Sequence, residues 1–245
     1  MMSHDSLIDI FSRELLASGA LTFGEYRLRS GRISPYYIDL RILISKPRLL
    51  SIAVEMISRL IDDLPLRPTK LCGIPMTGAL IVSAIAVSKN IPGIYIRKEP
   101  MIYKDLLRKI SGDSSIDPGC VDSLSRILGG VRSKTHGISR LVDGVIDDGD
   151  KILLVDDVIT TGDTKIEAIE ILEEEAKRRG KRIEILGVAV LIDREEGGED
   201  AMIKRGISLY RAVGIRSIIN SLEKQGLIDK SIQEAVERYL RGVPH

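Results

Sequence analysis

The sequence predicts an α/β protein with a mainly parallel central sheet, flanking helices and a small N-terminal element rich in β-structure. Short apolar segments alternate along the chain with longer segments whose apolar residues recur at helical spacing. This alternation is typical of parallel strands joined by right-handed crossover helices. Because 245 residues can bury one sizeable core, we expect residues 1–245 to form a single domain.

Residues 1–45 are expected to form a distinct element within that domain. Apolar residues at helical spacing predict a helix over residues 3–18, and the alternating, turn-rich stretch 23–41 predicts a small β-element. The apolar stripe over residues 46–62 predicts a second, stronger helix.

Strands and helices alternate through the rest of the chain. Ligands of open parallel sheets bind beyond the carboxyl ends of the strands. Four candidate loops lie at such ends, at 73–78, 97–99, 156–164 and 193–198, so we expect one shared site. The predicted elements are strand 70–74, helix 78–89, strand 91–97, strand 151–156, helix 163–179 with Gly180 as its C-cap, strands 183–192 and 207–213, and helices 217–225 and 231–241.

The strongest functional signal is the segment KILLVDDVITTGDT at 151–164. It predicts a buried strand that ends in Asp156 and Asp157, followed by a Thr/Gly loop that opens into a helix. Loop amides and a helix N-terminus favour a phosphate, whereas two adjacent carboxylates suit sugar hydroxyls or hydrated Mg²⁺. The segment therefore indicates a site for a phosphorylated ribose. The alternative is a strand edge and an N-cap with solvated carboxylates.

The sequence VDDVITTGDT resembles the phosphoribosyl-diphosphate (PRPP) signature of type I phosphoribosyltransferases, in the form typical of the orotate phosphoribosyltransferase family. Three further segments resemble that family in the same order, and the match spans roughly residues 10–225. Four ordered motifs are much more specific than one. The further segments are SGRISPYYID at 30–39, GIPMTGA at 73–79 followed by IYIRKE at 94–99, and LIDREEGG at 191–198.

The resemblance is interrupted after Glu99. In the family, the Arg-Lys-Glu segment continues within a few residues into Lys-x-His-Gly, which belongs to a mobile catalytic loop. Here the match to that motif is KTHG at 134–137, so we interpret residues 104–133 as an insertion in the loop. Such an insertion costs little, because the entropy of loop closure grows slowly with length.

The resemblance implies transfer of the 5-phosphoribosyl group from Mg²⁺-PRPP to orotate, giving orotidine 5′-monophosphate and pyrophosphate in pyrimidine (UMP) biosynthesis. It assigns Asp156 and Asp157 to the ribose hydroxyls, and Lys134 and His136 to the loop that closes over pyrophosphate. An exposed loop histidine without a role is the alternative for His136. Mg²⁺ is expected to bind mainly through PRPP, without a dedicated protein ligand. The other PRPP-binding residues implied are Gly73, Gly78, Arg97 and Lys98 for pyrophosphate and Thr160, Thr161, Gly162, Asp163 and Thr164 for the 5′-phosphate, with Asp163 as an N-cap.

On the orotate side, Arg194 is the expected partner of the substrate carboxylate, because a planar guanidinium binds a carboxylate bidentately. A solvated surface arginine is the alternative. Tyr36 or Tyr37 would stack on the pyrimidine, or else both are core or turn residues. Arg29 stands where the family usually has lysine, which keeps the charge and changes the geometry. Thr160 is assigned to both substrates.

Composition narrows the class of partners. The 36 basic and 35 acidic residues nearly cancel, which argues against a nucleic-acid or membrane-surface partner. No apolar run approaches the ~20 residues of a membrane span, and no secretory signal begins the chain, so we expect a cytoplasmic protein. Cys72 and Cys120 suggest neither a disulfide framework nor a metal cluster. The resemblance implies a homodimer that shares the mobile loop across its interface.

Two other functions stay open at this point. A phosphoribosyltransferase for another base, such as a purine, would have the same fold, although Arg194 favours an anionic base. A PRPP-binding regulator without turnover is favoured only by the insertion. The segment after residue 200 has no room for a fused decarboxylase barrel of ~250 residues, so a bifunctional enzyme is not expected.

Overall fold

A computed structural model describes residues 3–28, 31–65, 67–97, 123 and 140–242 of the chain. Several sequence-based assignments fall outside these residues and stay predictions. They are the roles of Arg29, Lys98, Lys134 and His136, the state of Cys120, and the 104–133 insertion apart from Ser123.

The described residues form a six-stranded central sheet whose strands are parallel except at one edge. The edge strand β5 runs antiparallel to β4. The mainly parallel sheet agrees with the prediction. Strand β5 was not predicted, because a strand of two residues is too short to show a hydrophobic period. In spatial order the strands are β5 (Val142–Asp143), β4 (Gly93–Ile96), β3 (Lys70–Gly73), β6 (Asp150–Ile159), β7 (Ile183–Asp193) and β8 (Leu209–Gly214).

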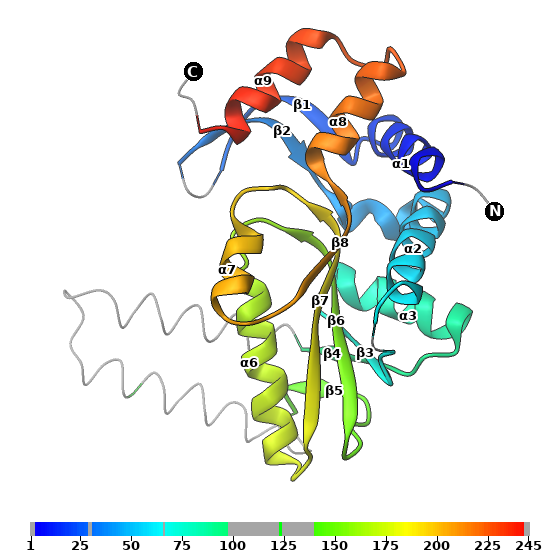
Figure 1. The fold of residues 1–245 in the computed structure, drawn as a ribbon, viewed down its shortest axis with the longest axis vertical. Coiled ribbons are helices and arrows are strands. Elements are labelled where there is room, and N and C mark those ends of the chain that lie inside the picture. Colours follow the sequence, from blue (N-terminus) through cyan, green and yellow to red (C-terminus); the bar gives the residue numbers. More distant parts are fainter. Residues whose placement is uncertain (1–2, 29–30, 66, 98–122, 124–139, 243–245) are drawn as a thin grey trace.

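Helices cover both faces of this sheet (Figure 1). Helix α6 (Asp163–Arg178) lies on one face, and α2 (Pro47–Asp62) and α3 (Thr77–Lys89) lie on the other. Helix α6 ends with Arg179 as its cap residue, and Gly180 follows in the left-handed conformation, so Gly180 lies one position beyond its predicted place.

The buried strand β6 separates two hydrophobic clusters. Its residues Ile152 and Leu154 pack into the cluster that contains α6, whereas Leu153 and Val155 pack into the cluster that contains α2 and α3. Successive side chains of a strand point to opposite faces. The continuous apolar run before Asp156 is therefore needed because both faces of β6 are covered.

A second layer lies beyond the carboxyl ends of the strands, at the top of Figure 1. It combines the N-terminal element with the two C-terminal helices: α1 packs on α8, and β2 contacts α9. The two ends of the chain thus build one layer, which was not evident from the sequence. Its elements are α1 (His4–Ser18), β1 (Leu21–Arg27), β2 (Ile33–Ile38), the 3-10 helix η1 (Leu40–Ser45), α8 (Ile215–Lys224) and α9 (Lys230–Leu240).

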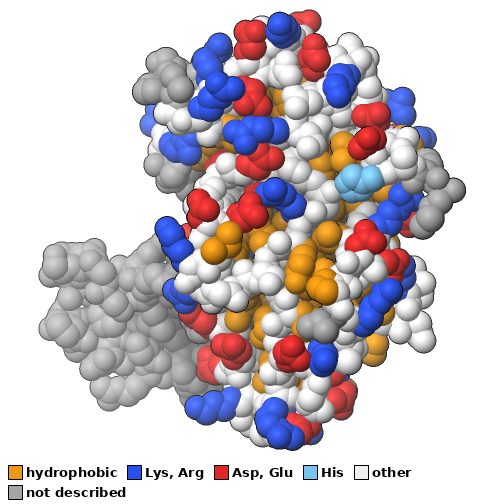
Figure 2. Space-filling view, in the orientation of Figure 1, with side chains coloured by type: hydrophobic (Ala, Val, Ile, Leu, Met, Phe, Trp, Pro, Cys, Tyr) orange, Lys and Arg blue, Asp and Glu red, His pale blue; other side chains and the backbone are white. Residues whose placement is uncertain are grey.

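Acidic and basic side chains are interspersed over the described part of the face drawn in Figure 2, in line with a formal net charge of +1. Within the described ranges, the helices are too short or too polar to cross a membrane.

Candidate functional site

The predicted loops converge where the parallel strands end. Gly73, the last residue of β3, pairs with Val155 of β6, and Ile159 at the end of β6 pairs with Asp193 at the end of β7. Asp193 also pairs with Gly214, the last residue of β8. The loops after β3, β6 and β7 therefore lie side by side at the carboxyl ends of the strands, below the layer formed by β1, β2, α8 and α9 (Figure 1).

Glycine is required at both ends of the loop that joins β3 to α3. A Cβ on Gly78 would overlap the carbonyl oxygen of Val155, and one on Gly73 would overlap the backbone of Ala79. The start of α3 thus packs directly against the end of β6. This contact leaves the backbone of residues 73–78 beside the acidic segment of β6.

The Thr160–Thr164 loop leads into α6 through Gly162, which has a φ of 91°. Gly162 is the N-cap residue, and it offers no side-chain acceptor to the amides of the first turn. The prediction that Asp163 is the N-cap is wrong, because the helix already begins at Asp163. The Asp163 carboxylate instead accepts a hydrogen bond from the Thr161 hydroxyl at 2.8 Å.

The adjacent carboxylates Asp156 and Asp157 have different environments. Asp156 is 4% exposed, and its Oδ2 lies 2.6 Å from Nζ of Lys165, which is 6% exposed. Burial raises the pKa of Asp156 to about 7, although the charge of Lys165 acts in the opposite direction. Asp157 is partly exposed, and its Oδ1 accepts the amide of Val158 at 2.8 Å. The structure thus leaves Asp157 as the more accessible carboxylate of the two.

Lys165 was missed by the sequence analysis. It stands in the first turn of α6, where a cation is unfavourable because the helix N-terminus carries partial positive charge. The only signal in the sequence was a lysine in the first turn of a predicted helix, next to its apolar stripe. That its partner is Asp156 became evident only from the structure.

Arg194 is buried beside Tyr36, so the alternative of a solvated surface arginine is wrong. Its side chain pairs with Glu196 at 2.8 Å, and Nε donates to the Tyr36 hydroxyl at 3.3 Å. The guanidinium carbon lies 4.7 Å from the centroid of the Tyr36 ring. Two residues that the sequence assigned to orotate, 158 positions apart in the chain, are therefore neighbours.

Tyr36 and Tyr37 point to opposite faces of β2, as successive strand residues do. Tyr36 is buried, its hydroxyl donates to Glu196 at 3.2 Å, and burial raises the pKa of its hydroxyl. Tyr37 is 39% exposed, and its ring centroid lies 5.5 Å from that of Tyr26. Only Tyr36 belongs to the cluster around Arg194.

The C-terminal helix α9 adds Tyr239 to this cluster. Its ring and that of Tyr36 meet edge to face with centroids 6.0 Å apart, and the Arg32 guanidinium carbon lies 4.4 Å from the centroid of the Tyr239 ring. The Arg32 guanidinium also donates to the Tyr239 carbonyl at 3.1 Å. Neither Arg32 nor Tyr239 was singled out in the sequence, because nothing in the local pattern places α9 beside β2.

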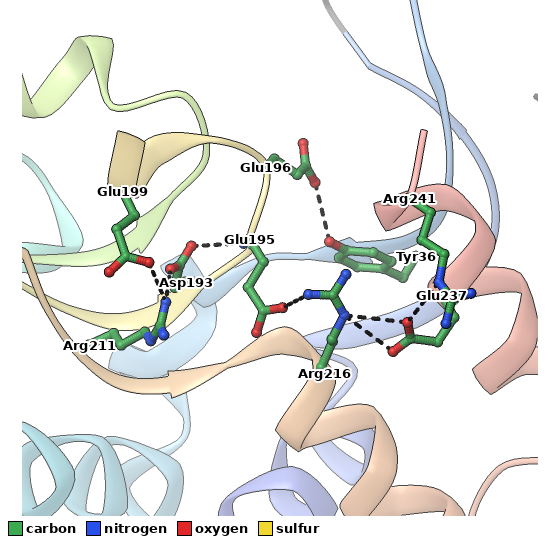
Figure 3. A network of polar contacts seen from close by, with 9 residues as sticks. All are labelled: Tyr36, Asp193, Glu195, Glu196, Glu199, Arg211, Arg216, Glu237 and Arg241. Atoms are coloured by element: carbon green, nitrogen blue, oxygen red, sulfur yellow. Dashed lines mark hydrogen bonds and ion pairs between the residues drawn. The ribbon is translucent and has the colours of Figure 1, made fainter. Parts of the chain in front are cut away.

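An ion-pair network holds the loop after β7 in place, as Figure 3 shows. The buried carboxylate of Asp193 pairs with Arg211 at 2.9 Å, and Arg211 also pairs with Glu199 at 3.0 Å. Glu195 pairs with Arg216 of α8 at 2.6 Å. The segment that carries Arg194 is thus tied to the sheet and to the C-terminal helices.

Arg97 is exposed just after β4, and its backbone amide donates to the carbonyl of Leu141 at 3.0 Å. Thr160 is partly exposed after β6. Within the described residues, no three His, Cys, Asp or Glu side chains come together in a way that could hold a metal ion. Cys72 is buried in β3, and burial raises the pKa of its thiol.

The chain is similar to several known proteins, although no protein-family model matches it. It is 31% identical over 248 residues to an orotate phosphoribosyltransferase of Staphylothermus marinus, and the match covers 100% of both chains. It is 27% identical to uridine 5′-monophosphate synthase of Bos taurus over 98% of this chain, which spans only 42% of that relative. The solved structure of Leishmania donovani UMP synthase shares the fold, with a TM-score of 0.72 and 24% identity over 96% of this chain and 42% of that one.

Proposed function

The chain belongs to the orotate phosphoribosyltransferase family, and from this premise we propose how its residues transfer the 5-phosphoribosyl group from PRPP to orotate. The reaction yields orotidine 5′-monophosphate and pyrophosphate, a step of pyrimidine biosynthesis. The observation that carries this function is the 31% identity to the Staphylothermus marinus enzyme over the whole of both chains. The position of the loops after β3, β6 and β7, side by side at the carboxyl ends of the strands, supports this function independently.

We assign the ribose hydroxyls of PRPP to Asp157. Its carboxylate is partly exposed at the end of β6, whereas that of Asp156 is buried against Lys165. The 5′-phosphate would lie on the backbone amides of residues 160–164, where the N-terminus of α6 favours an anion. Substrate held in this way has its anomeric carbon oriented for attack, which is the main requirement of such a displacement.

Pyrophosphate would meet the backbone of the 73–78 loop, and the family resemblance assigns Arg97 and Lys98 as its cations. Binding of PRPP as its Mg²⁺ complex would compensate the charge that develops on the leaving pyrophosphate. The donor set fits a metal held mainly through PRPP oxygens. Of the two adjacent carboxylates, Asp157 is the more exposed, so it is the one that would hold the ribose hydroxyls of Mg²⁺-PRPP.

Orotate is assigned to the cluster around Arg194. The Arg194 guanidinium is buried and oriented by Tyr36 and Glu196, so a substrate carboxylate would meet a positive charge that is already in position. A neutral purine would make poorer use of that charge. Tyr36 contributes its ring as the support of Arg194, and it has no exposed surface on which a base could stack without rearrangement.

We further propose a cytoplasmic homodimer in which Lys134 and His136, from the segment that resembles the family's catalytic loop, close over pyrophosphate. The support for this arrangement is the family resemblance of the KTHG segment at 134–137. Closure of this kind excludes water from the reacting centre.

The test is the loss of orotate absorbance when the intact chain is mixed with Mg²⁺ and PRPP. Turnover with orotate, and not with adenine, guanine or hypoxanthine, is the expected result. Turnover only with a purine would assign the chain to another base. Binding of PRPP by calorimetry without pyrophosphate release from any base would favour a regulator.

A further inference from the structure

We propose that Lys165 is a positioning residue for PRPP, and that Asp156 acts through its ion pair with Lys165 and does not bind the ribose. The inference rests on the proposed function, and it divides the two adjacent carboxylates between two tasks. Asp157 would contact substrate, whereas Asp156 would hold the loop that surrounds the substrate.

A continuous chain of contacts leads from Lys165 to Asp157. Lys165 Nζ lies 2.6 Å from Asp156 Oδ2, and Asp156 Oδ1 accepts the backbone amide of Asp157 at 2.9 Å. The carboxylate of Asp157 in turn accepts the amide of Val158 at 2.8 Å. Both oxygens of Asp156 are therefore engaged within the protein, and one of them sets the backbone from which the Asp157 side chain projects.

The Lys165–Asp156 pair also closes the phosphate loop at its base. Asp156 belongs to the end of β6 and Lys165 to the first turn of α6, so the pair joins the two ends of the segment 157–164. That segment carries the amides and hydroxyls assigned to the 5′-phosphate. A bridge across its ends fixes their spacing before PRPP arrives, which lowers the cost of ordering the loop on binding.

The position of Lys165 is locally unfavourable, which argues for such a role. A buried ammonium loses its hydration, and at a helix N-terminus it meets partial positive charge. An apolar residue would continue the buried stripe of α6 without either cost. Local rules are most often broken in this way where a functional site requires it.

The test compares four variants with the unaltered chain: Lys165→Met, Asp156→Asn, the double variant with both changes, and Lys70→Met. Steady-state assays give kcat and the KM for PRPP and for orotate separately, and thermal unfolding gives the melting temperature. Lys70→Met is the matched control, because Lys70 forms a buried pair with Asp150 at the other end of β6, away from the loop.

Each single change at the Lys165–Asp156 pair should lower kcat/KM for PRPP about tenfold or more, since coupled neighbours commonly interact on that scale. The KM for orotate should change little. The double variant should lose no more than either single variant, because both changes break the same ion pair and their effects are therefore not additive. Lys70→Met should lower the melting temperature without a selective effect on PRPP.

If the losses of the two single variants add in the double variant, or if Lys165→Met leaves kcat/KM for PRPP unchanged, Asp156 does not act through Lys165 and the inference fails. It also fails if Lys70→Met produces the same selective loss for PRPP. Should Lys165→Met not fold, Lys165→Gln takes its place, alone and in the double variant. A failure of the proposed function is seen separately, as absence of turnover in the unaltered chain. In that event, the affinity for PRPP measured by calorimetry replaces kcat/KM in the same comparison.

Discussion

Strand β6 carries a buried lysine–aspartate pair at each end, and the two pairs differ in how completely they are satisfied. At the amino end Asp150 pairs with Lys70, and near the carboxyl end Asp156 pairs with Lys165; the nitrogen–oxygen distance is 2.6 Å in both. All four residues are buried. Similar geometry thus occurs once far from the candidate site and once within it.

At the amino end, the carboxylate is surrounded by donors. Asp150 accepts hydrogen bonds from Lys70, from the Asp147 amide at 2.8 Å and from the Thr69 hydroxyl at 3.0 Å. Burial alone would raise its pKa, but these hydrogen bonds lower it below its ordinary value. The ionised pair is therefore well matched to its surroundings, and we interpret it as a structural clamp between β3 and β6.

Near the carboxyl end of β6, burial has the largest effect on the pKa of Asp156. Among the described residues, the partners of Asp156 are Lys165 and the Asp157 amide. The nearby charge of Asp157 adds to the effect of burial, so the pKa of Asp156 is raised to about 7. One strand thus holds a fully hydrogen-bonded pair for stability and a less completely hydrogen-bonded pair beside its ligand loops. Proteins often accept such a cost at functional sites.

The largest effect should come from Lys70→Met. Removing one partner of a buried pair leaves an uncompensated charge, so we expect the free energy of unfolding to fall by about 3–5 kcal/mol. Urea unfolding followed by circular dichroism measures this change. A loss below about 1 kcal/mol would show that the amino-end pair is no clamp, and the contrast between the two ends would disappear.

Asp157→Asn should have the next largest effect, and on catalysis. Loss of a preorganised charge in an active site commonly costs ~3–4 kcal/mol, so kcat should fall by about two to three orders of magnitude. The melting temperature should stay close to that of the unaltered chain. Asp148→Asn, at an exposed aspartate paired with Arg182, is the control and should leave kcat unchanged. Wild-type rates in Asp157→Asn would remove this residue from the site.

Arg194→Ala should affect the two substrates differently. A hydrogen bond to a charged group is worth about 1.5–3 kcal/mol, so the KM for orotate should rise about ten- to a hundredfold. The KM for PRPP should change much less. Arg194→Lys keeps the charge beside Glu196 but loses the planar fork, and it should restore only part of the affinity. Equal effects on both substrates would contradict the assignment to the orotate carboxylate.

The smallest predicted effect is on the pH dependence of stability. The contributions of Asp156 and Asp150, near the two ends of β6, should change with pH in opposite directions. The pKa of Asp156 is raised from 3.8 to about 7 on folding, so its contribution to stability is present below 3.8 and is lost as the pH rises to about 7. Asp156→Asn should therefore flatten the stability curve in this range, by at most about 1.4 kcal/mol per pH unit.

The pKa of Asp150 is lowered on folding, so its contribution is present above its ordinary value of 3.8 and is lost as the pH falls below it. Asp150→Asn should flatten the acid side of the same curve. Urea unfolding across the pH range measures both slopes. A change of the same sign in both variants would mean that the two pairs are electrostatically alike.

Much of the architecture could be predicted because the relevant information is local. The apolar run before Asp156 has the pattern of a strand covered on both faces, and the helices show their stripes at helical spacing. The short elements β5 and α7 (Gly198–Lys204) escaped, because they span too few residues to display a period.

The residues of the candidate site likewise fall into those that could be predicted from the sequence and those that could not. Asp157, the Thr160–Thr164 loop and Arg194 stand in motifs that are continuous in the chain, and their family resemblance is confirmed by the relatives. The side-chain partners that folding brings to these residues were not predicted. They are Lys165 for Asp156, Glu196 with Tyr36 for Arg194, and Tyr239 with Arg32 beside them.

The sequence by itself therefore determined the fold class, the family and the segments at which substrates are expected, since strand and helix periods and short motifs are local properties of the chain. Only the tertiary structure decided which of the two adjacent aspartates is buried, which tyrosine supports Arg194, and that the two ends of the chain form one layer over the strand ends. The physical reason is that burial and ion pairing depend on side chains brought together by packing, and neither is encoded in the spacing of residues along one segment.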